Sequence, residues 1–363
     1  MFSDAHKQNT RDWSRVEGLS CGTIGIGSPP QYFKIFFDTV HAGTWIPSTL
    51  CDKNKFPACR QHHRYNRSAS STSTPTEEIF HVNAFGGVIN GTLTKDTITL
   101  DGVTLKNHIF GEGVHMDGDH LLRAPFDGVI GLGFGLPERK YSTLLESLRE
   151  NGLINRKLFS IRLASKFSPD GEIMFGGVNP TKFKGNMTFV SFTDEFNLRF
   201  QMDQVTIGGT TLCTPYCNAV LNLGSFHIFP PASSRPMINQ VLRCQPEEDP
   251  CYVECNEVED LPDLQVVVNG LTIVLTSEDY VRKLRVGAVQ VCRTVFKNHD
   301  VDYWTLGIPF LNRTYIAYDM ENHRIGLAQA SGSLSTWSRK NTFGSLLVGL
   351  LLLPPRMHQT VFS

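Results

Sequence analysis

The hydrophobic pattern of the chain consists mainly of short apolar runs that end in turns. The clearest run, within the strand expected at Tyr32 to Phe37, leads into Asp38, breaks in a polar turn and resumes at Trp45. Continuous apolar runs of this length are typical of buried strands, so the pattern predicts a strand that delivers the Asp38 carboxylate to a loop. A weaker copy, residues 219–225, carries Asn222 where the first stretch carries its acid. We therefore predict two related loops, only one of which bears a carboxylate.

Apolar runs of strand length recur along the whole chain, whereas amphipathic helices are few and short. Residues 78–100 predict a β-hairpin, and Ala84 and Phe85 lie near its glycine-bearing tip, which could move. A glycine-punctuated apolar run at residues 126–133 has a counterpart at residues 303–310. This pattern predicts an all-β fold with a few short helices, built from two halves that repeat one plan.

The duplication suggests how the chain is divided. We expect a polar leader at residues 1–21, an N-terminal β lobe at 22–185, a C-terminal β lobe at 186–330 and a poorly ordered or signal-like tail at 331–363. The tail contains an apolar run at 343–353, which is too short to span a membrane and only loosely resembles a lipid-anchor signal. The leader lacks the apolar core of an export signal, and we expect that signal to be missing from this sequence.

Charge and cysteine content narrow the classes of function. Lys and Arg number 34 against 35 Asp and Glu, which gives no electrostatic case for binding nucleic acid or an acidic membrane. The nine cysteines are clustered but lack zinc-finger spacing, so they predict disulfides and an oxidising compartment. Four glycosylation sequons agree with a secreted or endolysosomal protein; they begin at Asn66, Asn90, Asn186 and Asn312.

Several blocks of the sequence together resemble the pepsin-like aspartic proteases, peptidase family A1. The resemblance covers residues 22–328 and rests on blocks at 22–31, 37–48, 126–132, 175–177, 261–263 and 318–328. It implies a bilobal fold with a peptide-binding cleft, one catalytic Asp from each lobe and a mobile hairpin flap. It also implies the disulfides Cys51–Cys59, Cys213–Cys217 and Cys255–Cys292; to these we add Cys244–Cys251 by proximity, which leaves Cys21 unpaired.

The chemistry that this resemblance implies needs two carboxylates that share one proton. The ionised acid draws a proton from a water molecule, and the protonated acid donates to the substrate carbonyl. The resemblance assigns the first position to Asp38 and the second to Asn222, and an amide cannot take part in proton cycling.

Other positions near this centre also depart from the family pattern. The resemblance implies cleft and flap roles for Thr39, His41, Trp45, Ala84, Phe85, Gly224 and Ser225. Among these, His41 replaces a small hydroxyl residue and Ala84 replaces the flap tyrosine. The turn glycine, the second threonine and a later aspartate are also lost, replaced by Val40, Leu223 and Ile308.

These losses predict a catalytically inactive pseudoprotease that binds a peptide or protein in the inter-lobe cleft, needing no cofactor or metal. Inactive members of the family occur among the placental pregnancy-associated glycoproteins and the insect allergens, which this chain resembles. The alternative is an aspartic endopeptidase with residual acid activity. Asn222 could also reflect a sequence error or a damaged gene.

Two weaker chemical interpretations remain open. His41 and Asp38 could form a Ser/His/Asp arrangement with Ser225, although no nucleophile is clearly placed with them. Residues 115–120 carry side chains that metals accept, and we expect them to form a solvated loop rather than a metal site.

Overall fold

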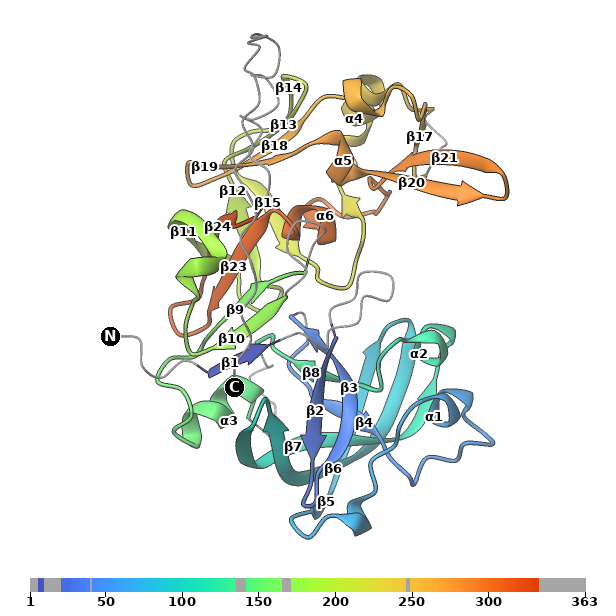
Figure 1. Cartoon of the computed structure of the whole chain (residues 1–363), viewed down its shortest axis with the longest axis vertical. Coiled ribbons are helices and arrows are strands. Elements are labelled where there is room, and N and C mark those ends of the chain that lie inside the picture. The colour runs from blue at the N-terminus through green and yellow to red at the C-terminus, as the bar shows by residue number, and fades with distance from the viewer. Residues whose placement is uncertain are drawn as a thin grey trace, which may run out of the picture. The chain divides into compact units, whose positions relative to one another are not determined.

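The computed structural model describes residues 6–9, 21–39, 41–134, 142–164, 171–245 and 249–332. Strands dominate these segments and the helices are short, which confirms the predicted all-β fold (Figure 1). The helices are α1 (Pro57–Gln61), α2 (Asp119–Arg123), α3 (Leu144–Glu150), α4 (Arg235–Leu242), α5 (Ser277–Tyr280) and α6 (Ile308–Leu311).

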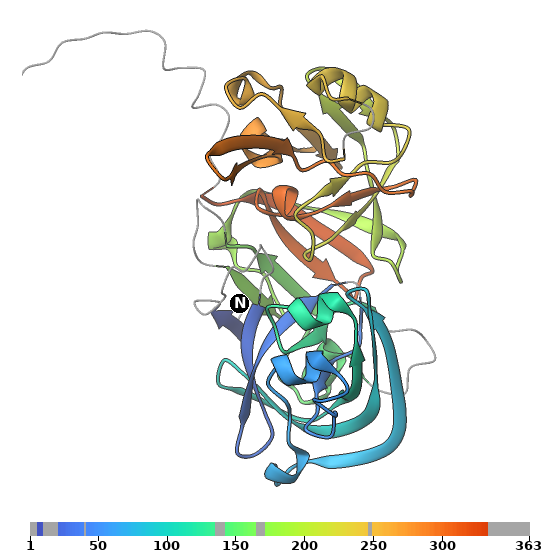
Figure 2. The same ribbon diagram turned by 90° about the vertical axis from the view of Figure 1, so that its right-hand side faces the viewer.

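A seven-stranded sheet forms most of the N-terminal half. Its long strands curve in the view of Figure 2, and α1 and α2 belong to the same half. In spatial order the strands are β2 (Cys21–Ile26), β3 (Gln31–Asp38), β8 (Gly128–Gly131), β4 (Trp45–Pro47), β7 (Val103–Asp117), β6 (Gly87–Leu100) and β5 (Thr74–Ala84).

A ten-stranded sheet joins strands from both halves of the chain. Its order is β1 (His6–Asn9), β10 (Glu172–Phe175), β9 (Leu158–Arg162), β23 (Thr314–Asp319), β24 (Arg324–Ala330), β11 (Phe183–Asp194), β12 (Arg199–Met202), β15 (Cys217–Leu221), β22 (Trp304–Leu306) and β16 (Ile228–Phe229). The expected leader thus contributes an edge strand, β1. The expected boundary at residue 185 falls within β11, so the two halves share this sheet.

Two small sheets complete the C-terminal half. One contains β14 (Thr210–Cys213), β13 (Gln204–Ile207), β18 (Leu264–Val268) and β19 (Leu271–Leu275). The other contains β17 (Tyr252–Val253), β21 (Val289–Thr294) and β20 (Val281–Val286), with β20 at its edge.

The cysteines pair as the sequence predicted. Disulfides join Cys51 to Cys59, Cys213 to Cys217, Cys244 to Cys251 and Cys255 to Cys292, and Cys21 is free and buried. Three of the four bonds lie in the C-terminal half, where the small sheets and their connecting loops provide less strand pairing than the N-terminal sheet does.

The expectation of a loop at residues 115–120 is wrong. Strand β7 continues to Asp117 because it pairs with β6, with Met116 opposite Ile89, and α2 begins at Asp119. Across the segments described above, no three His, Cys, Asp or Glu side chains gather in a way that could hold a metal ion.

The apolar run at 343–353, on which the anchor-signal expectation rests, lies outside the described residues. Within the segments that are described, no helix has the length and apolar character needed to cross a bilayer.

Candidate functional site

The first predicted loop leaves the end of a fully paired strand. The last four residues of β3 are buried, and β3 runs parallel to β8 so that Asp38 lies opposite Gly131. The backbone N–H of Leu132 donates a hydrogen bond to the Asp38 carbonyl at 2.7 Å. Strand pairing therefore fixes the backbone of Asp38, which is only 6% exposed.

Gly131 allows the loop to cross the neighbouring strand closely. A Cβ atom at this position would lie 2.3 Å from the backbone carbonyl carbon of Ala42 and 2.5 Å from the His41 carbonyl oxygen. Only a glycine permits backbone to approach backbone at this distance. The glycine-punctuated run found in the sequence is therefore what lets the loop pack over β8.

Asp38 has a basic partner within its own loop. Nδ1 of His41 lies 2.6 Å from Oδ2 of Asp38, and the His41 side chain is 44% exposed while that of Asp38 is 8% exposed. The hydrogen bond to Asp38 raises the pKa of His41, burial lowers it, and the Asp38 charge raises it further. The Asp38 carboxylate is thus hydrogen-bonded to the His41 imidazole, and this contact favours the protonated form of the imidazole.

The second predicted loop repeats the backbone scheme of the first. Strand β15 runs parallel to β22, and the N–H of Asn222 donates to the Leu306 carbonyl at 3.0 Å. A Cβ on Gly307 would lie 2.3 Å from the His227 carbonyl oxygen and 2.4 Å from that of Ser225. Strand β16 then pairs antiparallel with β22, as β4 pairs with β8. The predicted repeat of strand, loop and crossing glycine is confirmed.

The side chains of the second loop are bonded within that loop. The amide oxygen of Asn222 accepts the N–H of Gly224 at 2.8 Å, and the hydroxyl oxygen of Ser225 accepts the N–H of His227 at 3.0 Å. Both are local side-chain-to-backbone turns of the kind Asn and Ser favour. Within the part of the chain that the structure describes, Ser225 forms no hydrogen bond with His41, so the geometry does not support a Ser/His/Asp arrangement.

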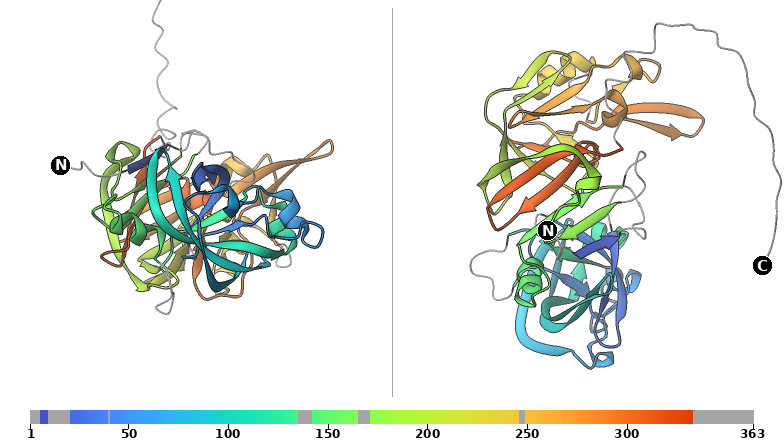
Figure 3. Two further views of the ribbon diagram at one scale, coloured as in Figure 1. Left: turned by 90° about the horizontal axis from the view of Figure 1, so that it is seen from below. Right: turned by 60° about the vertical axis from the view of Figure 1, so that its left-hand side comes forward.

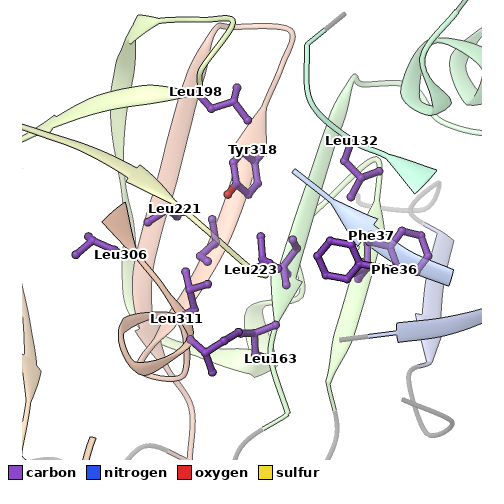
Figure 4. Packing of buried hydrophobic residues seen from close by; sticks show 14 of the residues in the cluster. Phe36, Phe37, Leu132, Leu163, Leu198, Leu221, Leu223, Leu306, Leu311 and Tyr318 are labelled. Atoms are coloured by element: carbon purple, nitrogen blue, oxygen red, sulfur yellow. The ribbon is translucent and has the colours of Figure 1, made fainter. Parts of the chain in front are cut away.

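Leu223 is buried, whereas the neighbouring residues Asn222 and Gly224 are at least partly exposed. It is 3% exposed and belongs to the same hydrophobic cluster as Phe37, Leu132 and Leu311 (Figure 4). An apolar side chain therefore occupies the position where the family resemblance implies a threonine.

Tyr318 is a neighbour of the first loop that the sequence reasoning missed. It lies on β23, stacks on Phe159 with ring centroids 4.6 Å apart, and is 1% exposed. Burial raises its pKa, the adjacent Thr39 side chain lowers it, and the charge of Asp38 raises it again. The only signal in the sequence was its place beside Asp319 in the last family block, which does not show that the side chain lies near the first loop.

The hairpin tip near the first loop is held down by aromatic packing. Strands β5 and β6 meet at Phe85 and Gly86, whose φ angles are 51° and 62°. The Phe85 ring lies 5.7 Å from that of Phe36 and 5.1 Å from that of Phe126. Ala84 is 7% exposed and offers no polar group at this place. Of the other predicted cleft residues, Trp45 is part of the core and Gly224 is exposed.

Comparison with known proteins agrees with this geometry. The family model described as eukaryotic aspartyl protease matches residues 20–330. The chain belongs to this family. It is 31% identical to cathepsin D of Gallus gallus, with 85% of this chain and 80% of the relative covered. It is 29% identical to cathepsin E of Oryctolagus cuniculus at the same coverage, and 32% identical to renin of Canis lupus familiaris over 85% and 78%.

Proposed function

We propose that this aspartyl protease family member does not cleave peptides and acts by binding a peptide or protein ligand in the cleft between its lobes. The observation that carries the proposal is the unequal pair of loops. One carries Asp38, and the other carries Asn222, whose side-chain amide closes its own turn through Gly224.

The family reaction needs a second acid that donates a proton to the substrate carbonyl. Loss of such general acid–base help typically costs about 10²–10⁴-fold in rate, and loss of one member of a cooperating unit often costs more. The Nδ1 atom of His41, which belongs to the same loop, lies 2.6 Å from a carboxylate oxygen of Asp38. An imidazole in that place supports retention of a charged pair rather than a shared proton between two acids.

The proposal is tested by acid digestion of a denatured protein substrate over pH 3 to 6, with and without a statine-type inhibitor. We expect no inhibitor-sensitive cleavage from the wild type. Asp38→Asn is the matched control, because it removes the remaining carboxylate and exposes any contaminating protease. Cleavage that the inhibitor blocks and that Asp38→Asn abolishes would establish the alternative, an endopeptidase with residual activity.

Asn222→Asp tests whether the proposed loss of catalysis depends on more than the missing second carboxylate. We expect this change to restore little activity, because Leu223, Ala84 and His41 remain as they are. A vigorous protease from this single substitution would contradict the proposal that the site has lost its chemistry more broadly.

Binding is tested with a statine-containing peptide and its analogue with alanine in place of statine, by titration calorimetry. We expect both peptides to bind with similar affinity, because the statine hydroxyl no longer finds two acids. Failure of both peptides to bind would contradict a role in binding extended peptides.

We also infer that the protein is a secreted or lumenal glycoprotein. The four disulfides support an oxidising compartment. The sequons differ in access: Asn186 is exposed on β11, Asn66 and Asn90 are half-buried, and the Asn312 side-chain oxygen is buried. Asn186 is therefore the glycan acceptor that the folded surface favours most.

A further inference from the structure

The hairpin formed by β20 and β21 concentrates positive charge in a chain that is nearly neutral overall. Residues 281–297 contain no Asp or Glu, and five basic residues: Arg282, Lys283, Arg285, Arg293 and Lys297. Over the whole chain, 34 basic residues face 35 acidic ones. The balance of the whole sequence therefore conceals a strongly basic segment.

In the described segments these charges form no ion pairs. Among the ion pairs of the described segments, none includes any of the five basic residues. Arg282 lies over the ring of Phe226, 4.8 Å from its centroid, and so turns its charge toward an aromatic face instead of a carboxylate.

The positive charge of this cluster affects the nearby imidazole of His227. Burial lowers the pKa of His227, and the charges of Lys297, Arg293 and Arg282 lower it further, while Asp249 opposes them. Three of the five cations thus lower the pKa of His227 at the base of the hairpin, and one acidic residue, Asp249, opposes this effect.

The tip of the same hairpin is aliphatic and exposed. Val286 and Val289 pair across the turn at Gly287 and Ala288 and are 65% and 63% exposed. Figures 1 and 3 show the β20–β21 hairpin extending away from the other elements of its half, with this turn at its far end. The hairpin is therefore graded along its length, with an apolar end followed by a basic collar that consists of Arg285, Lys283, Arg282 and Arg293.

We propose that the β20–β21 hairpin docks on an anionic lipid surface, with Val286 and Val289 entering the headgroup region and the basic collar contacting lipid phosphates and carboxylates. Basic residues near an anionic membrane are attracted by its negative surface potential. Long Lys and Arg side chains keep their charges in the headgroups while their stems and the apolar tip lie deeper. The base of the hairpin contacts the second loop, because Arg282 lies over Phe226, whereas the hairpin itself extends away from the other elements (Figure 1).

An acidic protein partner is the competing occupant, and the grading of the hairpin argues against it. Lys283 and Arg285 lie on the exposed edge strand β20, where charges discourage the addition of another strand. Neither protection of the edge strand nor binding of an acidic protein would explain two exposed valines at the far end. A membrane has charged headgroups outside and hydrocarbon beneath. A hairpin that approaches it end-on, with an apolar tip followed by basic residues, matches this order.

The test is co-sedimentation of the full chain with vesicles of phosphatidylcholine alone and with 30% phosphatidylserine, at low and at high salt. We expect binding to the anionic vesicles only, weakening as salt rises because exposed charges are screened. Lys283→Glu/Arg285→Glu should weaken this binding by at least about tenfold. Lys106→Glu/Lys184→Glu, an equal charge reversal at exposed positions elsewhere, should weaken it far less.

The tip is tested separately with Val286→Ser/Val289→Ser against Leu50→Ser/Ile79→Ser, which removes two other exposed aliphatic side chains. We expect only the hairpin variant to lose affinity for anionic vesicles. Equal losses in a variant and its control, or binding of an acidic peptide without binding of vesicles, would overturn the proposal. Asp38→Asn should bind vesicles as the wild type does, so this result is independent of the proposed cleft function.

Discussion

The loops at Asp38 and Asn222 share a backbone and differ in chemistry. Each follows a buried strand, each strand runs parallel to a partner, and each loop crosses that partner at a glycine, Gly131 or Gly307. In the first loop the Asp38 carboxylate contacts His41, and in the second the Asn222 amide oxygen accepts a hydrogen bond from the Gly224 N–H of its own turn. Strand pairing and glycine contacts thus preserve the architecture without any help from the second carboxylate.

The largest expected effect comes from filling the crossing glycines. We expect Gly131→Ala and Gly307→Ala each to lower the free energy of unfolding by at least about 2–3 kcal/mol, because the new Cβ would overlap backbone atoms at 2.3 Å. Urea unfolding measures the change.

Gly102→Ala serves as the control for these two variants, since its Cβ meets nothing within 4 Å and only its φ of +79° is unfavourable. Its cost should be about 1 kcal/mol. A large loss at Gly131 with a small loss at Gly307 would show that the two loops are not structurally equivalent.

An intermediate effect is expected from Asn222→Ala. This change removes the acceptor for the Gly224 N–H, and loss of such a local side-chain bond costs about 1 kcal/mol. The measurement is again urea unfolding, with Asn222→Asp as the matched variant, because a carboxylate keeps an acceptor oxygen. If Asn222→Asp were as unstable as Asn222→Ala, the turn bond would not be what Asn222 contributes.

The smallest effect concerns the pH dependence of the first loop. Folding raises the pKa of His41, so its pairing with Asp38 stabilises the protein below the ordinary histidine pKa and is lost as pH rises through the raised value. We expect His41→Ala to destabilise by under about 1 kcal/mol near pH 6, because the imidazole is partly exposed, and by less near pH 9.

The control for His41 is the same substitution made in an Asp38→Asn background. If the histidine acts through this carboxylate, the difference between pH 6 and pH 9 should disappear there. A difference that persists without Asp38 would assign the effect to another partner of His41.

The sequence predicted those parts of the site that depend on local pattern. The strand before Asp38, its weaker copy before Asn222 and the crossing glycines follow from runs of apolar residues and small turns. The three disulfides that the family pattern implied and the one added by proximity also form.

Contacts between distant segments could not be predicted in this way. Tyr318 lies near the first loop only because β23 pairs with β9 within the shared sheet, and no local pattern encodes that register. The bond between His41 and Asp38 depends on side-chain orientation in a turn, and the Asn222 turn depends on which backbone N–H the amide meets. The strand β1 has an unremarkable polar sequence and exists because β10 offers it an edge.

The shared ten-stranded sheet also sets the order in which the molecule can be completed during synthesis. Strand β9 belongs to the first half of the chain, yet its neighbour β23 ends only at Asp319, with Ile161 opposite Ile316. Contacts so distant along the chain form late and slow folding. The edge of β9 that pairs with β23 therefore stays open until most of the chain has been synthesised, and an unpaired strand edge is prone to pair with other chains in the meantime.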